Sequence, residues 1–163
     1  MTVPILLRHL KIGDIGWVAH RQGILYAQEY GWDGSFEALV AEIAAQFVKN
    51  FDSAWENAWI AERDGQVLGS VFLVKVSEQE AKLRLLYVEP DSRGTGLGRR
   101  LTQECIAFAK SKGYQKLTLW TNDILHTARR IYQEAGFVLV SEEPHCSFGA
   151  DLVGQYWALD LRA

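Results

Sequence analysis

The chain has 163 residues, of which 48% are hydrophobic, and 17 basic against 20 acidic side chains leave a net charge of −3. This composition excludes an intrinsically disordered chain, and the length predicts one domain over residues 1–163. The longest apolar stretches fall short of a membrane span, and the chain does not start like a signal peptide. The two cysteines are too few for a zinc site or a disulfide framework. We therefore expect a cytoplasmic protein that has no membrane span and binds no metal.

The first half of the chain is predicted to contain a strand, two helices and a hairpin. The expected elements are a strand at 3–10, helices at 14–30 and 35–50, and strands at 57–63 and 66–76. Ser35 is the expected N-cap of the second helix. Asp64-Gly65 is a strong hairpin signal, and the strand after it is apolar on both faces, which indicates an interior strand.

The second half alternates strands and helices. The expected elements are a strand at 81–88, a helix at 97–112, a strand at 116–121, a helix at 124–135 and strands at 137–143 and 154–161, with a loop over 144–152. Gly113 and Gly136 follow the two helices, as helix-ending glycines do. Antiparallel strands followed by a strand–helix–strand unit predict an α+β fold, a mixed and mostly antiparallel sheet of about seven strands flanked by about four helices.

A glycine-rich loop, RGTGLGRR at residues 93–100, lies between a predicted strand and a predicted helix. Glycines let backbone N–H groups approach a ligand, and the helix N-terminus adds free donors and a positive dipole end, so the loop is suited to a phosphate or diphosphate. Residues 82–100 carry five basic side chains against two acidic ones, which in an acidic protein favours a small anion over nucleic acid. The alternative is a turn that only caps the helix.

The spacing fits neither of two common nucleotide loops. Arg99 and Leu101 stand where G-x-G-x-x-G requires its last glycine, and Arg99-Arg100 replace the Gly-Lys of a P-loop. Arg93, Gly96 and Gly98 do fit R/Q-x-x-G-x-G/A, with LRLLYVEPDS before them and IYQEAGF later in the chain. This pattern resembles the coenzyme A loop of the GNAT superfamily of N-acetyltransferases.

The resemblance implies a GNAT-like fold and transfer of an acetyl group from acetyl-CoA to a primary amine, by direct attack in a ternary complex and without a metal. Two segments, LYAQEYGWDGSFEALVAEI and SFGADLVGQYWALDL, resemble the acetyltransferase half of proteins that join a MarR-type DNA-binding domain to a GNAT domain. The chain has no room for that DNA-binding half, so we expect a stand-alone relative or a fragment. The alternative function is a non-catalytic acyl-CoA sensor, the effector domain of a transcriptional regulator.

The resemblance assigns the cofactor to this loop and the strand before it: Leu86, Tyr87, Val88, Arg93, Gly94, Thr95, Gly96, Leu97, Gly98 and Arg99. A backbone N–H near Val88 is expected to polarise the thioester carbonyl. Tyr132 matches the family's proton donor to the departing thiolate, and its alternative is a core tyrosine. Asn122 is expected to cap the next helix or, alternatively, to bind the pantetheine arm.

The acceptor amine needs a proton acceptor, because an amine is almost fully protonated at neutral pH. The sequence leaves Glu29, His145 and Glu89 open for this role, each with the alternative of a solvated surface group.

The acceptor wall is assigned to aromatic residues at the junction of the first two helices, which alternatively form a helix-pair core: Tyr26, Tyr30, Trp32 and Phe36. Glu29 and Asp33 beside them favour a cationic amine, which can be a small molecule or the amino group of a larger one. An acetyl-cysteine is not expected, because Cys105 lies on an apolar stripe and Cys146 is only a sequence neighbour of His145. The resemblance also suggests a homodimer.

Overall fold

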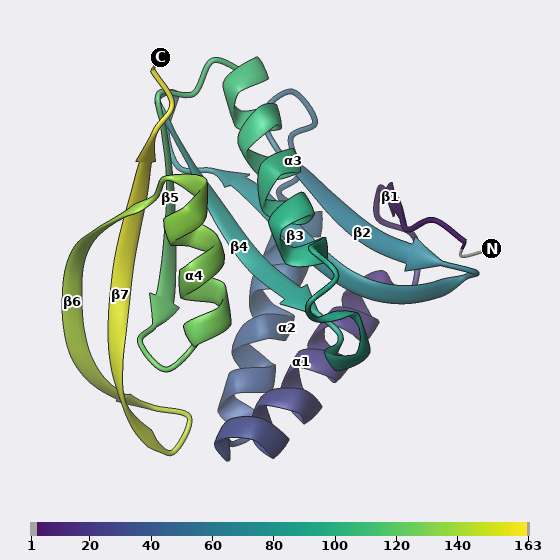
Figure 1. The fold of residues 1–163 in the computed structure, drawn as a ribbon, viewed down its shortest axis with the longest axis vertical. Helices are drawn as coiled ribbons and strands as arrows, with labels where there is room; N and C mark the ends of the chain where they lie inside the picture. The colour runs from purple at the N-terminus through teal and green to yellow at the C-terminus, as the bar shows by residue number, and fades with distance from the viewer. Residues whose placement is uncertain (1–2, 163) are drawn as a thin grey trace.

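The structure is a computed structural model that describes residues 3–162, and its centre is a seven-stranded sheet in the order β1-β2-β3-β4-β5-β7-β6 (Figure 1). The strands are β1 (Leu6–Arg8), β2 (Asn57–Arg63), β3 (Gln66–Lys75), β4 (Glu80–Val88), β5 (Lys116–Asn122), β6 (Val138–Ser147) and β7 (Ala150–Asp160). Only the β4–β5 pair is parallel among these neighbours. The expected mixed, mostly antiparallel sheet and the interior place of β3 are confirmed.

Four helices cover the two faces of the sheet. They are α1 (Asp14–Tyr30), α2 (Gly34–Lys49), α3 (Leu97–Ser111) and α4 (His126–Ala135). In Figure 1, α3 and α4 lie in front of the sheet and α1 and α2 behind it. Cys105 of α3 is fully buried between α3 and the sheet, where burial raises the pKa of its thiol, so an acetyl-cysteine at this position is excluded. Across residues 3–162, every helix is too short or too polar to cross a membrane.

Some predicted boundaries were wrong. β1 has three residues instead of spanning 3–10, and α4 begins at His126 rather than at 124. The expected loop over 144–152 is instead the end of β6 and the start of β7, joined by a turn in which Phe148 and Gly149 have positive φ. β6 is an edge strand with one side in solvent, so it tolerates Pro144 and polar residues that in the sequence look like a loop.

The caps also differ from the prediction. Asp33, not Ser35, is the N-cap of α2, and its carboxylate accepts a hydrogen bond from the backbone N–H of Ser35 at 3.0 Å. An Asp at this position accepts from one of the free N–H groups of the first turn, and its negative charge interacts favourably with the positive end of the helix dipole.

The parallel pair β4–β5 separates after a short contact. Its register covers three residue pairs and ends at Lys82 opposite Thr118. Beyond that point β4 bulges: Leu85 has a φ of 53°, the register with β3 shifts, and the Ser70 hydroxyl donates to the carbonyl of Leu85 at 3.1 Å. A left-handed non-glycine residue in a bulge bends the strand. The end of β4 therefore turns its backbone edge away from β5.

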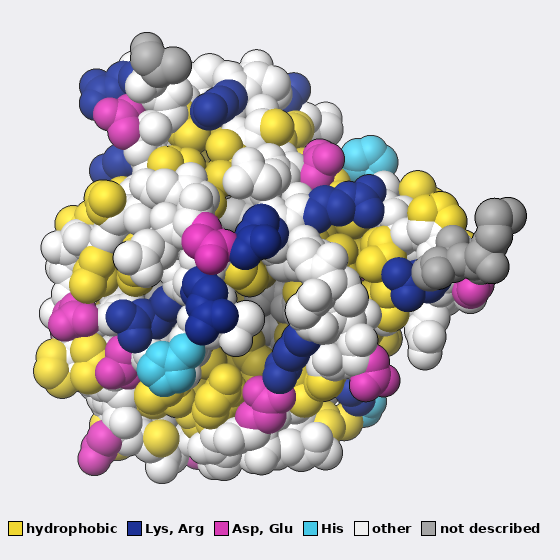
Figure 2. Space-filling model, in the orientation of Figure 1, with side chains coloured by type: hydrophobic (Ala, Val, Ile, Leu, Met, Phe, Trp, Pro, Cys, Tyr) yellow, Lys and Arg dark blue, Asp and Glu magenta, His cyan; other side chains and the backbone are white. Residues whose placement is uncertain are grey.

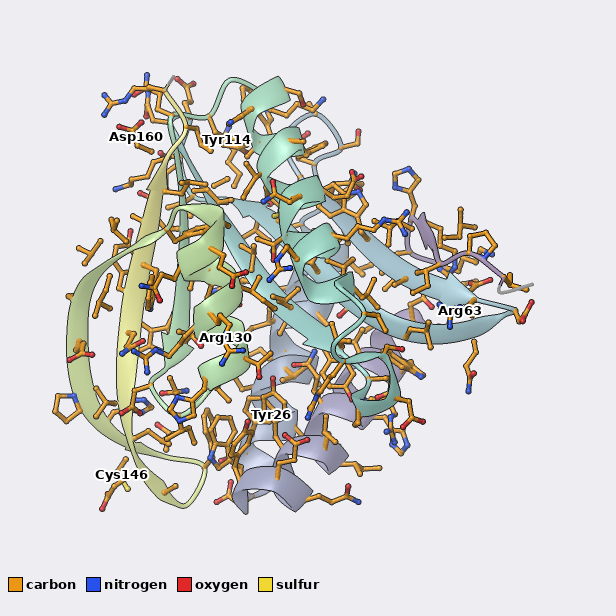
Figure 3. All side chains as sticks on the ribbon, in the orientation of Figure 1. Tyr26, Arg63, Tyr114, Arg130, Cys146 and Asp160 are labelled. Atoms are coloured by element: carbon orange, nitrogen blue, oxygen red, sulfur yellow. The ribbon has the colours of Figure 1, made fainter. Side chains whose placement is uncertain are left out.

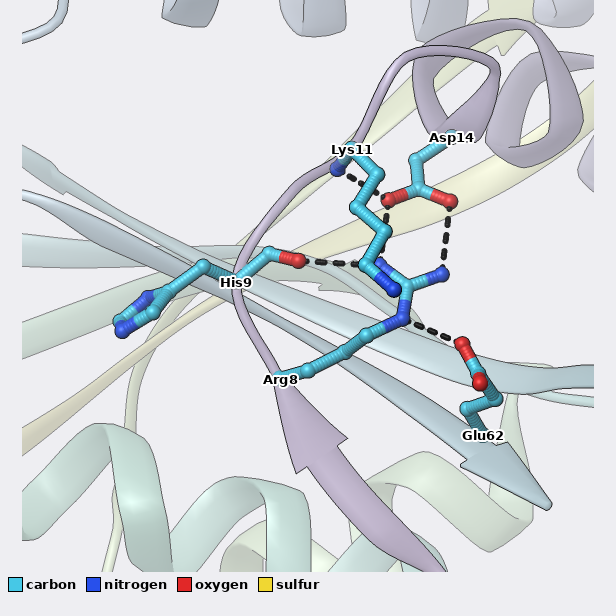
Figure 4. A network of polar contacts seen from close by, with 5 residues as sticks. All are labelled: Arg8, His9, Lys11, Asp14 and Glu62. Atoms are coloured by element: carbon cyan, nitrogen blue, oxygen red, sulfur yellow. Dashed lines mark hydrogen bonds and ion pairs between the residues drawn. The ribbon is translucent and has the colours of Figure 1, made fainter. Parts of the chain in front are cut away.

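Arg8 ties the first strand to the first helix (Figure 4). Its guanidinium donates to both carboxylate oxygens of the buried Asp14 at 2.8 and 3.1 Å, and also pairs with Glu62 of β2. Burial alone raises the pKa of Asp14, but the bonds from Arg8 and from the Lys11 N–H outweigh it, so the pKa lies below its usual value. This network fixes the start of α1, the helix that forms one wall of the site described below.

We expect Asp14→Asn to lower the free energy of unfolding at pH 7 by about 1–3 kcal/mol, because it leaves a largely buried guanidinium without one of its charged partners. A carboxyl with a lowered folded-state pKa stabilises the fold above its unfolded pKa of about 3.9 and loses that contribution as pH falls through the folded value. The difference between wild type and variant in urea unfolding should therefore shrink below about pH 4. A difference that is constant from pH 7 to pH 3 would contradict this role.

Candidate active site

The glycine loop connects the single turn Pro90–Ser92 to α3. Gly94 and Gly96 have φ of 78° and 84°, and a Cβ at either position would meet no other atom within 4 Å. The Thr95 hydroxyl donates to the carbonyl of Ser92 at 2.6 Å and so holds the turn. The first turn of α3 leaves N–H groups without partners inside the helix. The loop therefore presents backbone amides to open space, beside a hollow ringed by Lys and Arg side chains between the starts of α3 and α4 (Figure 2).

The arginines of the loop already have protein partners. Arg93 pairs with Glu29 of α1 at 2.7 Å, Arg99 pairs with Glu134 of α4, and Arg100 donates to the carbonyl of Ile5 at 2.8 Å. Of these three, Arg93 lines the smaller of the two cavities described below. Its guanidinium therefore lies between the loop and α1.

Gly98 lies at a close contact between α3, α4 and the end of β4. A Cβ there would lie 2.8 Å from Cδ1 of Ile131 and 3.6 Å from Cγ2 of Val88. The glycine lets α3 approach α4 and the end of β4 closely. This close contact favours a glycine at position 98 independently of the cofactor role that the sequence analysis gave it.

Two neighbouring cavities lie between the loop and the first two helices, and Arg93 of the loop lines the smaller one. The smaller one, of about 100 Å³, is lined by Tyr26, Glu29, Tyr30, Leu86, Tyr87, Val88, Arg93, Leu125, Thr127, Ala128 and Ile131. The larger one, of about 320 Å³, lies where β4 and β5 have separated, under α1 and α2. Both are bordered by Leu86 of β4, Ala128 of α4 and Tyr26, which Figure 3 shows on α1 near the lower end of α4. The two cavities are therefore neighbours, with the smaller one on the side of the glycine loop.

Tyr132 of α4 lines the larger cavity. Its side chain is 5% exposed and its ring meets Phe137 edge to face at 5.8 Å, so the residue is part of the core as well as of the cavity wall. Burial raises the pKa of the phenol. The hydroxyl therefore stays protonated at neutral pH and is available as a hydrogen-bond donor.

Asn122 and His145 form a bonded pair in the same cavity. His145 Nε2 lies 2.9 Å from Oδ1 of Asn122, and its Nδ1 lies 2.9 Å from the Ser147 hydroxyl. Since Oδ1 only accepts, Nε2 carries the proton and Nδ1 keeps a lone pair in the neutral ring. The prediction that Asn122 caps α4 was wrong: Leu125 occupies the N-cap, and no side chain caps this helix.

The two other candidate bases are engaged elsewhere. Glu29 is paired with Arg93 and borders only the smaller cavity. Glu89 accepts from Arg21 at 2.9 Å and from the Tyr87 hydroxyl, and it lines neither of these cavities. His145 is the one candidate of the three that lines the larger cavity.

The aromatic cluster is both a helix-pair core and a cavity wall. Trp32 and Phe36 line the larger cavity with their ring centroids 4.8 Å apart, and Tyr26 stacks on Phe36 at the same distance. Tyr30 borders the smaller cavity instead. Neither expected carboxylate lines the larger cavity: Asp33 caps α2, and Glu29 pairs with Arg93 beside the smaller one. In the larger cavity, the expectation of a cationic acceptor therefore rests on the aromatic rings alone.

Two further aromatic walls were missed in the sequence. Phe148 comes from the turn between β6 and β7 and meets Trp32 at 4.9 Å. Trp120 of β5 lies against Gly154 of β7, where a Cβ would come within 1.9 Å of Cζ2 of the indole. Gly154 was a possible signal, since a glycine inside a strand often marks a close approach.

Comparison with known proteins places these features in a family. The model of the acetyltransferase (GNAT) family matches residues 25–137. N-acetyltransferase family 8 member 2 of Rattus norvegicus is 32% identical over 106 residues, which are 62% of this chain and 46% of that protein. An uncharacterized N-acetyltransferase of Schizosaccharomyces pombe is 32% identical over 113 residues, 69% of each chain.

The chain spans about half the length of several curated relatives, from 37% to 55% of the first three. Among solved structures, an acetyltransferase from Salmonella typhimurium with its cofactor acetyl-CoA has a TM-score of 0.76 at 17% identity, covering 97% of this chain and 94% of that one. At 17% identity, this structural similarity supports the fold alone.

Proposed function

This chain belongs to the acetyltransferase (GNAT) family, and on that premise we propose that it transfers the acetyl group of acetyl-CoA to a primary amine. The observation that carries the proposal is that the glycine loop, the free edge of β4 and the cavity lined by Tyr132 lie next to one another. A loop that only capped a helix would not need cavities beside it.

The residues of this chain fit the co-substrate. The amides of the loop and of the first turn of α3 are suited to the diphosphate, and the positions of Gly94 and Gly96 leave room for it. The edge of β4 at Leu86 to Val88 borders the narrow cavity and offers backbone groups to the amides of the pantetheine arm. A backbone N–H near Val88 is the proposed donor to the thioester oxygen, whose charge grows during attack.

In the transfer itself, the amine nitrogen bonds to the acetyl carbon as the carbon–sulfur bond breaks. The amine gives up one proton and the departing thiolate takes up one. Tyr132 is the proposed donor to the sulfur, because its buried phenol stays protonated. His145 is the proposed acceptor of the amine proton, because its ring lines the same cavity and its unprotonated Nδ1 faces the Ser147 hydroxyl, which can relay the proton.

We expect His145→Gln to lower kcat about 100-fold, because glutamine can still donate to Asn122 but cannot take up a proton. The rate of thiol release at saturating acetyl-CoA and amine is the measurement. Glu29→Gln is the comparison: if it lowers kcat at saturating acetyl-CoA and His145→Gln does not, the base has been assigned wrongly.

The proposed function is tested by release of free thiol from acetyl-CoA in the presence of a panel of primary amines. Release that depends on an amine, with a matching N-acetyl product in the mass spectrum, is the expected result. Tight binding of CoA without release with any amine would favour the alternative, an acyl-CoA sensor.

We also propose a cytoplasmic protein whose partner is a small molecule or an amino group, without nucleic acid or membrane. A homodimer is supported by three exposed apolar side chains on the edge strand β6, Val138, Leu139 and Val140. The likeness to the acetyltransferase half of MarR fusion proteins stays a prediction, which rests on the two segments quoted above.

A further inference from the structure

The larger cavity is cationic at one side and apolar at the other. Lys82 and Arg84 of β4 line it beneath α2, and no Asp or Glu is among its lining residues. Most of the remaining lining is aromatic or aliphatic and includes Trp32, Phe36 and Phe148. A cavity of this kind attracts an anionic group on an apolar body and disfavours a second cation.

The two cations lack anionic partners in the protein. Within residues 3–162 neither Lys82 nor Arg84 has a carboxylate within 4 Å. Burial lowers the pKa of both side chains, and for Lys82 the neighbouring Arg84 adds to the effect. Glu80 is the acidic group near Lys82, and it is already shared between Lys116 at 3.3 Å and the Thr118 hydroxyl at 3.0 Å.

Two buried donors in the same wall also lack partners. The side-chain nitrogens Nε2 of Gln22 and Nε1 of Trp32 make no hydrogen bond, although these residues are only 3% and 4% exposed and both line the cavity. An unsatisfied buried N–H is destabilising, and a bound acceptor group can offset that cost. A bound group with negatively charged oxygens would therefore give a partner to both the free donors and the cations of this cavity.

We propose that the amine acceptor carries a carboxylate, as a free amino acid with an apolar side chain does, and that this carboxylate binds at Arg84 and Lys82 with Gln22 and Trp32 as further donors. The inference rests on the proposed function and names the substrate class of the same cavity. The amino group then lies toward His145 and Tyr132, and the side chain against the aromatic wall. A planar guanidinium is well matched to a carboxylate, which it can bind through two parallel hydrogen bonds.

The test compares acceptors that differ only in the carboxylate. Phenylalanine, leucine and methionine are paired with phenethylamine, isoamylamine and 3-(methylthio)propylamine, and kcat/KM is measured by thiol release at saturating acetyl-CoA. We expect each amino acid to be preferred at least tenfold, since the charge-assisted hydrogen bonds to the carboxylate are lost in the amine. Equal or better turnover of the amines would overturn the inference while leaving the acetyltransferase function intact.

A binding measurement keeps the inference testable if no acceptor is turned over. The affinities of N-acetylphenylalanine and N-acetylphenethylamine are measured by calorimetry on the full chain with CoA present. Tighter binding of the carboxylate by tenfold or more supports the subsite even if the enzymatic function fails. Equal affinity refutes it.

Arg84→Gln is expected to reduce the preference for the carboxylate at least tenfold in both measurements. Arg63→Gln is the matched control, because Arg63 lies at the far end of β2, away from the cavity (Figure 3). Its carboxylate preference should equal that of the wild type. If Arg84→Gln is folded by circular dichroism and keeps the full preference, the assignment of the subsite is wrong; if it does not fold, Lys82→Gln takes its place with the same expectation.

Discussion

Tyr132→Phe should lower kcat by about 10²- to 10⁴-fold while the dissociation constant of acetyl-CoA changes little. The phenylalanine ring keeps the contact with Phe137 and the burial of the wall, so the change removes one hydroxyl from the larger cavity. That hydroxyl is needed only when negative charge develops on the leaving sulfur, so its loss acts on the transition state rather than on binding. Single-turnover thiol release and calorimetry with CoA measure the two quantities separately.

Tyr114→Phe is the matched control for this change. Tyr114 is also buried and its hydroxyl donates to the carbonyl of Trp55 at 2.8 Å, but it lies beyond the end of α3, far from the cavity (Figure 3). The control should lose stability without losing turnover. If single turnovers show that chemistry limits the rate and kcat is still equal in wild type and Tyr132→Phe, Tyr132 is not the proton donor. Its role is then only to pack in the core.

The sheet and the loop could be predicted because their signals are local. A hairpin at Asp64-Gly65, apolar periodicity in the helices and glycines at fixed spacing each report on neighbouring residues. The bulge at Leu85 has no such signal, because a leucine at positive φ is held there by tertiary contacts such as the bond from Ser70. The separation of β4 from β5, and with it the cavity, therefore has no signal in the local sequence.

The charge of the site depended on partners that are distant in the sequence. Glu29 and Asp33 stand beside the aromatic cluster in the chain, but one pairs with Arg93 and the other caps a helix. Lys82 and Arg84 alternate with apolar residues of β4 and look like the solvent face of a strand. Only the fold shows that α2 covers this face, and that two cations there face a cavity without a carboxylate.

Gly96→Asp should weaken CoA binding by at least about 100-fold. The wild-type backbone at Gly96 is left-handed, and the space around its Cα is open on the side where a Cβ would project. An aspartate carboxylate would therefore stand where the loop amides face the diphosphate, and two like charges about 4 Å apart repel by roughly 4 kcal/mol at the effective dielectric of a protein surface. Direct titration of CoA is the measurement, and raised salt should relieve part of the loss.

Gly96→Asn separates charge from backbone strain in the same position. Asparagine has nearly the same shape as aspartate and adopts the left-handed region at a similar cost, so any loss it shares with Gly96→Asp comes from bulk and conformation. The difference in affinity between the two variants is then the electrostatic part, which should be at least tenfold if a diphosphate lies on these amides. If both variants bind CoA as the wild type does, the ligand does not contact this loop, and the cavities beside it must serve another molecule.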